Sequence, residues 1–107
     1  MQTDIQRLFR GLADPTRREL IAILANDEHS ISGLAARFDS SRNAIVKHLK
    51  VLEDGGIVGS YSRGKEKCHF LRAENLKPAY EWLSDYEKFW DNKLLQLKSA
   101  VEESRHE

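Results

Sequence analysis

A predicted helix between residues 42 and 54 carries its polar and cationic side chains on one side. At about 100° per residue, the outward positions hold an amide, an aliphatic and two cationic side chains: Asn43, Val46, Lys47 and Lys50. The opposite positions are aliphatic: Ile45, Leu49 and Leu52. An asparagine amide can form two hydrogen bonds with adenine, lysine can reach guanine or phosphate, and valine can contact a thymine methyl group. The pattern therefore predicts a helix that enters the major groove of duplex DNA; the alternative is an ordinary solvated helix face.

The preceding residues predict that this helix is the second of a helix-turn-helix, residues 31–54. The first helix of the pair has four apolar positions: Ile31, Leu34, Ala35 and Phe38. Ser30 is its candidate N-cap, residues 39–40 form the turn, and Ser41 is the candidate N-cap of the second helix. Ser41 and Arg42 begin that second helix, where free backbone N–H groups and the helix dipole favour a phosphate. Gly55-Gly56 is expected to end it.

Two short β-like runs follow and predict a hairpin, or wing, over residues 57–72. The runs are Ile57–Ser62 and Lys67–Arg72, joined by the turn 63–66 with Gly64 at a left-handed position. The tip carries three cations: Arg63, Lys65 and Lys67. One face of the hairpin is expected to carry Val58 and Phe70, with Cys68 as a further candidate. A hairpin that follows a helix-turn-helix is typical of winged-helix proteins.

Two further helices are predicted before the helix-turn-helix. The first covers residues 2–11 and has apolar side chains at helical spacing: Ile5, Leu8, Phe9 and Leu12. The second begins at Asp14-Pro15, because aspartate is a good N-cap and proline suits the first helical position. Its apolar stripe is Leu20, Ile21, Ile23 and Leu24, and residues 26–28 end it.

The C-terminal part, residues 74–104, reads as one long amphipathic helix in which Pro78 is tolerable only in the first turn. Five of the nine aromatic residues lie between Tyr80 and Trp90. Its apolar stripe comprises Trp82, Leu83, Tyr86, Phe89, Trp90, Leu94, Leu97 and Val101. A stripe this long exceeds what one small domain can cover, so we expect it to pair with a partner subunit. The alternative is a helix folded back on its own domain.

Length and composition favour a single soluble domain that spans residues 1–107. Apolar residues make up 40% and charged residues 32% of the chain. No apolar run approaches the roughly 18 residues needed to span a bilayer, and the N-terminus has no signal-peptide core. We therefore expect a cytoplasmic protein that does not insert into a membrane.

The zero net charge hides a segregation of charge along the chain. Residues 41–72 hold seven basic and three acidic residues, which gives +4, whereas residues 73–107 hold five basic and eight acidic residues, which gives −3. Contact with phosphates needs local rather than global positive charge. The cationic middle therefore agrees with a DNA-binding helix-turn-helix and wing.

Several segments in this order resemble the ArsR/SmtB family of winged-helix repressors. The matching segments are Ala13-Asp14-Pro15-Thr16-Arg17-Arg18, Leu34-Ala35, residues 47–53, residues 55–58, the wing residues 63–67, and Trp82-Leu83 with Tyr86, Phe89 and Trp90. The resemblance covers nearly the whole chain. It implies a mainly α fold with a small β-hairpin, in the order of four helices, two strands and a long C-terminal dimerisation helix.

The resemblance also implies a function and its site residues. It implies a homodimer, built on the first and last helices, that binds an inverted repeat in a promoter and releases it on a signal. The dimer interface would then include Ile5, Leu8, Phe9, Trp82, Leu83, Tyr86, Phe89, Trp90, Leu94 and Leu97. The DNA contacts would be Thr16, Arg17, Ser41, Arg42, Asn43, Val46, Lys47, Lys50, Arg63 and Lys65. Arg18 would join Thr16 and Arg17 in holding phosphate.

The sequence departs from the metal-sensing members of that family. Residues 31–38 contain no cysteine or histidine, and the last helix has carboxylates but no histidine before His106. Carboxylates alone do not make a transition-metal site of this kind, so we expect neither a metal nor a cofactor. The aromatic last helix and the wing sequence are more similar to the metal-independent branch. Val46 also replaces the serine or threonine that is usual in the middle of the family's DNA-binding helix.

Other reactive residues have simpler interpretations. The single cysteine, Cys68, excludes an internal disulfide and is expected to be a small buried hydrophobe. His48, beside the apolar face of the second helix, is expected to make a packing or phosphate contact. No combination of residues resembles a catalytic set, so an enzyme is not expected.

Two hypotheses of function follow. The first is a homodimeric DNA-binding repressor, in which substitution of Asn43 or Lys47 changes operator preference and Lys65 contributes to binding of any DNA. The second is a winged-helix module that binds protein through the aromatic helix and does not bind DNA. The operator, the regulated genes and the inducing signal are not encoded in any motif that we identify.

Overall fold

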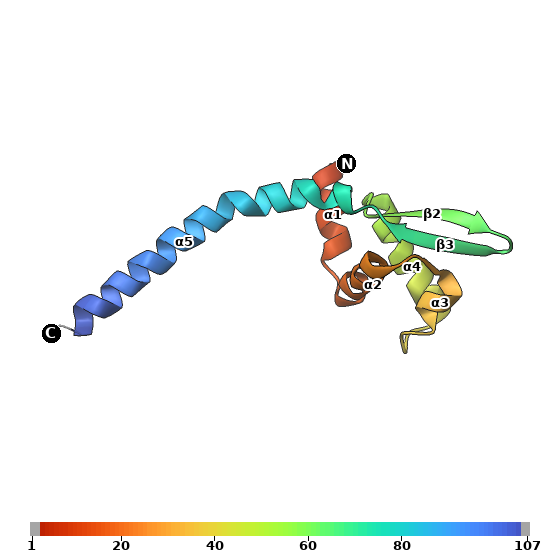
Figure 1. Cartoon of the computed structure of the whole chain (residues 1–107), viewed down its shortest axis with the longest axis horizontal. Coiled ribbons are helices and arrows are strands. Elements are labelled where there is room, and N and C mark those ends of the chain that lie inside the picture. Colours follow the sequence, from red (N-terminus) through yellow and green to blue (C-terminus); the bar gives the residue numbers. More distant parts are fainter. Residues whose placement is uncertain (1–2, 106–107) are drawn as a thin grey trace. The chain divides into compact units, whose positions relative to one another are not determined.

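The computed structural model describes residues 3–105 (Figure 1). These residues divide between Lys77 and Pro78 into two compact units. The first unit contains the helices α1 (Asp4–Leu12), α2 (Pro15–Asn26), α3 (Ile31–Ala35) and α4 (Arg42–Asp54). It also contains the strands β1 (His29–Ser30), β2 (Val58–Arg63) and β3 (Glu66–Leu71), and the 3₁₀ turn η1 (Ala73–Leu76). The helix α5 (Lys77–Arg105) makes up the second unit. The fold is the predicted one, mainly helical with a β wing.

Side-chain caps begin α2, α3 and α4 at the predicted residues. The side chain of Asp14 accepts a hydrogen bond from Arg17 N at 3.1 Å, and Pro15 is the first helical residue of α2. The hydroxyls of Ser30 and Ser41 accept from Gly33 N at 3.0 Å and Ala44 N at 3.1 Å. These three caps confirm the predicted starts of α2, α3 and α4.

Aliphatic side chains from every helix of the first unit form its core. They are Leu8, Leu20, Leu24, Leu34, Ile45, Leu49, Leu52 and Ile57, each at most 4% exposed. The end of α4 lies close to α1, since a Cβ built at Gly55 would be 2.9 Å from the carbonyl oxygen of Arg7. The core therefore holds α4 by its apolar face and by a backbone contact at its C-terminal end.

The wing belongs to a three-stranded antiparallel sheet with the order β1-β3-β2, so the predicted hairpin omitted one strand. In β1, His29 and Ser30 pair with His69 and Cys68 of the central strand. A strand of two residues is too short to produce an alternating pattern in the sequence. It forms because it supplies hydrogen-bond partners to the backbone of β3 on the side that β2 does not cover.

The register of β2 and β3 corrects the predicted faces of the wing. Val58 lies opposite Leu71, whereas Phe70 lies opposite Gly59 and Cys68 opposite Tyr61. Side chains that pair directly across an antiparallel sheet share a face, and alternate residues change face. Val58 is therefore on the other face from Phe70 and Cys68, and the expectation of one shared face was wrong. Gly64, with φ of 64°, begins the two-residue turn as predicted.

Two boundaries also differ from the sequence prediction. Helix α3 ends at Ala35, so Phe38 lies beyond it in the connection to α4. The last helix begins at Lys77 rather than residue 74, because η1 precedes it. Pro78 is the second residue of α5, in the first turn as expected.

Candidate DNA-binding surface

The outer face of α4 presents the side chains that were predicted to contact bases. All four of them, Asn43, Val46, Lys47 and Lys50, are exposed, Val46 to 39%. The opposite face is closed by Ile45, Leu49 and Leu52, none more than 1% exposed. One helix thus carries an amide, a small apolar group and two cations on a surface backed by a rigid core. Such a face fits the edges and phosphates of a major groove.

The N-terminal end of α4 is fixed to the preceding helix. Nη1 of Arg42 donates a hydrogen bond to Oγ of Ser32 at 2.8 Å, across the turn of the helix-turn-helix. Ser41 caps α4 and, like Arg42, is exposed. Both predicted phosphate contacts at this end therefore lie on the surface beside free backbone N–H groups.

The wing tip carries two of the predicted contacts, Arg63 and Lys65, both exposed. The orientation of the wing depends on a contact that the sequence did not suggest. The hydroxyl of Tyr61 in β2 donates a hydrogen bond to Oε2 of Glu28, just before β1, at 3.1 Å. This bond raises the pKa of Tyr61 and ties the outer strand of the wing to the end of α2.

A second unforeseen contact joins the wing to α4. His69 in β3 is 2% exposed, and its Nε2 lies 3.0 Å from Oε1 of Glu53 in α4. Lys67 Nζ is 3.7 Å from the same carboxylate oxygen. Neither Glu53 Oε1 nor His69 Nδ1 completes an aligned hydrogen bond within the described part of the chain. Burial lowers the pKa of His69; Glu53 opposes this shift and Lys67 adds to it.

The lowered pKa of His69 predicts acid sensitivity of this junction. The unfolded chain takes up a proton on His69 below a pH of about 6.5, whereas the folded chain resists it. The free energy of unfolding should therefore be highest above that pH and should fall as the pH decreases below it. We expect urea unfolding from pH 7.5 to 5 to show a smaller pH dependence in His69→Gln than in the original chain. An equal dependence in both proteins would contradict this expectation, since the remaining histidines are shared.

Thr16 and Arg17, the predicted phosphate contacts of α2, are both half-buried. The guanidinium of Arg17 is directed toward the protein. Its Nε donates to the carbonyl of Gly11 at 3.0 Å and its Nη2 to the carbonyl of Arg10 at 2.7 Å. Arg18 similarly donates from Nη1 to the carbonyl of Leu12 at 2.8 Å. These side chains cap the last turn of α1.

The helix α5, taken by itself, exposes most of the predicted interface residues. Leu83, Tyr86, Trp90, Leu94 and Leu97 are between 47% and 63% exposed. The rings of Trp82 and Tyr86 lie 4.7 Å apart between centroids, and Trp90 is edge-on to Phe89 at 6.2 Å. In α1, Ile5 and Phe9 are half-buried, and Leu8 is 3% exposed and part of the core.

The family's metal sites have no counterpart in the described residues. Between residues 3 and 105 no three histidine, cysteine, aspartate or glutamate side chains are arranged to hold a metal ion. Asp85, Glu87 and Asp91 occupy α5 without a histidine beside them, and His106 lies outside the described residues. Cys68 is a buried free thiol, as expected. No helix in the described part of the chain is long and apolar enough to cross a membrane.

Comparison with known proteins gives a consistent family. Residues 12–59 match a family described as "Helix-turn-helix domain". The HTH-type transcriptional regulator Rv2034 of Mycobacterium tuberculosis is 31% identical over 90% of this chain and 87% of its own length. The structure of an ArsR-like transcriptional regulator from Rhodococcus sp. RHA1 is 32% identical, with a TM-score of 0.74 over 92% of this chain and 91% of that one.

A third similarity, at lower identity, concerns the fold. The structure of Mb0332 from Mycobacterium bovis, described as a homodimeric winged helix-turn-helix DNA-binding domain, is 20% identical, with a TM-score of 0.65 over 78% of this chain and 81% of that one. It shares the winged helix-turn-helix architecture described above. The matches of sequence and fold agree with the exposed face of α4. The chain therefore belongs to the ArsR family of winged helix-turn-helix transcriptional regulators and is a DNA-binding regulator.

Proposed function

We propose that two copies of the chain bind an inverted-repeat operator and repress the adjacent promoter. The exposed face of α4 is the observation that carries this proposal. In a symmetric dimer the two α4 helices would enter successive major grooves about 34–36 Å apart. Asn43, Val46 and Lys47 would face base edges, Lys50 and the N-terminal end of α4 would face phosphates, and the wing tip would reach the flanking backbone or minor groove.

The dimer is proposed from the aromatic and aliphatic stripe of α5. Side chains as large as Tyr86 and Trp90 are about half exposed or more, and a stripe of this length is usually covered by a partner. A second copy of α5 would cover it symmetrically, with Ile5 and Phe9 of α1 at the edge of the interface. The homodimeric state named for Mb0332 supports a dimer.

Repression would follow from occupation of the operator, and a signal would lower the affinity of the dimer for it. The signal is not proposed to be a metal ion, since no three potential metal ligands are grouped among the described residues of one chain. A cytoplasmic location and the absence of catalytic activity belong to the same proposal. The outer face of α4 favours DNA over the protein-docking alternative, since Val46 is the one apolar side chain exposed on the described outer face of that helix.

Selection of bound duplexes from a random pool tests the proposal directly. We expect two similar half-sites related by a two-fold axis, with centres about 10–10.5 base pairs, or a small multiple of that distance, apart. A single unrepeated half-site would contradict the dimer, and no enrichment even at low salt would favour the protein-docking alternative. Gel shifts of the selected duplex with zinc, oxidant or cell extract would then identify the class of signal.

A further inference from the structure

Arg17 joins three helices of the first unit through one side chain. Arg17 is the third residue of α2. Its Nε and Nη2 donate hydrogen bonds to carbonyl oxygens in the last turn of α1, those of Gly11 and Arg10. Its Nη1 lies 3.3 Å from Nδ1 of His48, in the middle of α4. Arginine suits this task because its guanidinium presents donors in several fixed directions at once.

The contact with His48 is a hydrogen bond in one tautomer of that imidazole. A guanidinium only donates hydrogen bonds, so the bond forms where Nδ1 of His48 is unprotonated and accepts from Arg17. Asp14 lies beside both residues, because its Oδ2 accepts from Arg17 N at 3.1 Å and lies 3.9 Å from Nδ1 of His48. The bond from Arg17 N lowers the pKa of Asp14 and thereby favours its ionised form. Asp14 thus fixes the backbone of Arg17, and Arg17 fixes the ring of His48.

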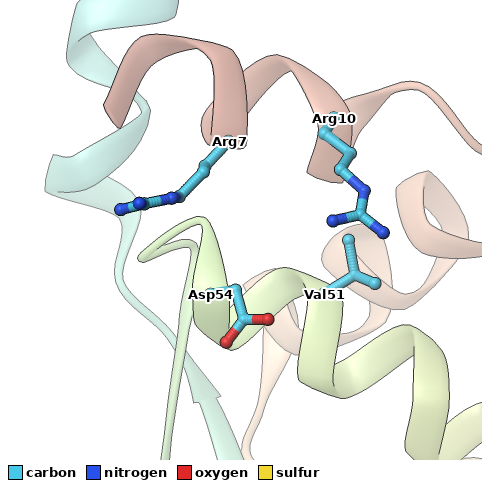
Figure 2. Close-up of a pocket in the computed structure, with 4 residues that line it drawn as sticks. All are labelled: Arg7, Arg10, Val51 and Asp54. Atoms are coloured by element: carbon cyan, nitrogen blue, oxygen red, sulfur yellow. The ribbon is translucent and has the colours of Figure 1, made fainter. Parts of the chain in front are cut away.

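His48 lies on the flank of α4 that faces the protein rather than on the outer face. It is half-buried, and a helical wheel places it roughly opposite the outward-facing Asn43, Lys47 and Lys50. One turn further along α4, Val51 lines a hollow of about 320 Å³ between α1 and α4, together with Arg7, Arg10 and Asp54 (Figure 2). Apolar packing is therefore incomplete beside Val51, and the polar link through Arg17 adds a second connection between α1 and α4 to the backbone contact at Gly55.

We propose that Arg17 is a positioning residue that sets the angle of α4 against α1, and that it does not bind phosphate. The inference rests on the proposed function, in which α1 lies at the dimer interface and α4 in the major groove. The link through Arg17 then connects the dimer interface to the spacing of the two DNA-binding helices. It replaces the role of Arg17 expected from the family resemblance.

Charge-conserving substitution distinguishes the two roles. Arg17→Lys keeps the positive charge, but lysine cannot bridge two carbonyls and His48 together. A phosphate contact would survive this change with nearly unaltered affinity. A positioning role predicts that affinity for the selected operator falls by about three- to thirtyfold, while affinity for random duplex changes little. Near-original affinity in Arg17→Lys would overturn the inference.

The salt dependence of binding provides an independent readout, with Lys65→Ala as the matched phosphate-contact control. Each lost phosphate contact makes the slope of log affinity against log salt shallower by about 1. We expect that reduction for Lys65→Ala and an unchanged slope for Arg17→Gln, despite its weaker operator binding. A shallower slope in Arg17→Gln, with equal loss on operator and random duplex, would instead assign it to phosphate.

Variants of His48 test the link from its other end. His48→Asn retains an acceptor near the position of Nδ1 and should keep most of the operator affinity, whereas His48→Leu should lose as much as Arg17→Lys. The double variant Arg17→Lys, His48→Leu should be no worse than either single variant. Additive losses would contradict a shared role. The contrast between the two single variants of His48 still tests the link if Arg17→Lys fails to fold, as judged by thermal unfolding.

Nuclear magnetic resonance of the histidine rings checks the geometry without DNA. The ring nitrogens of His48 should report an unprotonated, hydrogen-bonded Nδ1 in the original chain, and this signal should shift in Arg17→Lys. A protonated Nδ1 in the original chain would overturn the inference even if DNA binding is confirmed. Failure of the proposed function would appear differently, as absence of sequence-specific binding by the original chain.

Discussion

Asn43→Ala is expected to remove most of the preference of the protein for its operator. Asn43 lies in the first turn of α4, exposed, on a helix whose opposite face is closed by the core. A bidentate amide contact with adenine contributes about 1–3 kcal/mol to discrimination between bases. The ratio of operator affinity to random-duplex affinity should therefore fall about ten- to hundredfold. Affinity for random duplex should change by less than about twofold, because phosphate contacts supply most of it.

Competition binding with labelled operator and unlabelled random duplex measures that ratio. Lys47→Ala, one turn further along the same face of α4, should also lower this affinity ratio. It removes one positive charge as well. Asn26→Ala is the matched control, since Asn26 is an exposed asparagine whose side chain donates a hydrogen bond to the carbonyl of Ala22 within α2. If Asn43→Ala and Lys47→Ala both keep the original ratio, the outer face of α4 is not the surface that distinguishes sequences.

The features of this surface that the sequence predicted are those determined locally. Asp14, Ser30 and Ser41 cap helices because a short polar side chain before a helical pattern satisfies free N–H groups a few residues on. The two faces of α4 follow from helical periodicity alone. Exposure of Asn43, Val46, Lys47 and Lys50 was therefore predictable, although their contacts with DNA remain predictions.

The features that escaped prediction depend on partners distant in the chain. The pairing of β1 with β3, the bond of Tyr61 to Glu28, and the approach of His69 to Glu53 join residues that no local pattern connects. The two faces of the wing, in contrast, could have been predicted from the sequence. The turn around Gly64 already places Val58 opposite Leu71, and counting outward from that turn would have separated Val58 from Phe70.

Arg17 illustrates why residue type alone misassigns a role. An arginine near the start of a helix in a cationic DNA-binding protein is a natural phosphate contact, and that was the expectation. Its actual partners are carbonyl oxygens at the end of α1 and a ring nitrogen in α4. The carbonyl acceptors are within reach because only two residues, Ala13 and Asp14, separate α1 from α2, which places the end of one helix beside the first turn of the next.

Trp90→Asp is expected to convert the dimer into monomers. Trp90 is 61% exposed in the single chain, in the middle of the stripe that runs from Leu83 to Leu97. An aspartate there would remove a large aromatic contact and would bury a charge against the apolar side chains of the partner. Losses at such central aromatic positions reach about 2–4 kcal/mol or more, so the dissociation constant of the dimer should rise by at least about thirtyfold. Sedimentation velocity across a concentration series measures this change.

Asn92→Asp is the matched control, because it places the same charge two residues away, on an exposed side chain of α5 that lies off the stripe. It should remain dimeric, and circular dichroism should show that both variants keep their helix. The loss of dimer should also weaken operator binding by about a hundredfold or more, since each half-site would then be bound without the effective concentration that the second subunit provides. An intact Trp90→Asp dimer would place the interface elsewhere. Dissociation of both variants would show that α5 tolerates no added charge and would leave its stripe without a special role. Only the contrast between the two substitutions therefore assigns the interface to the aromatic face.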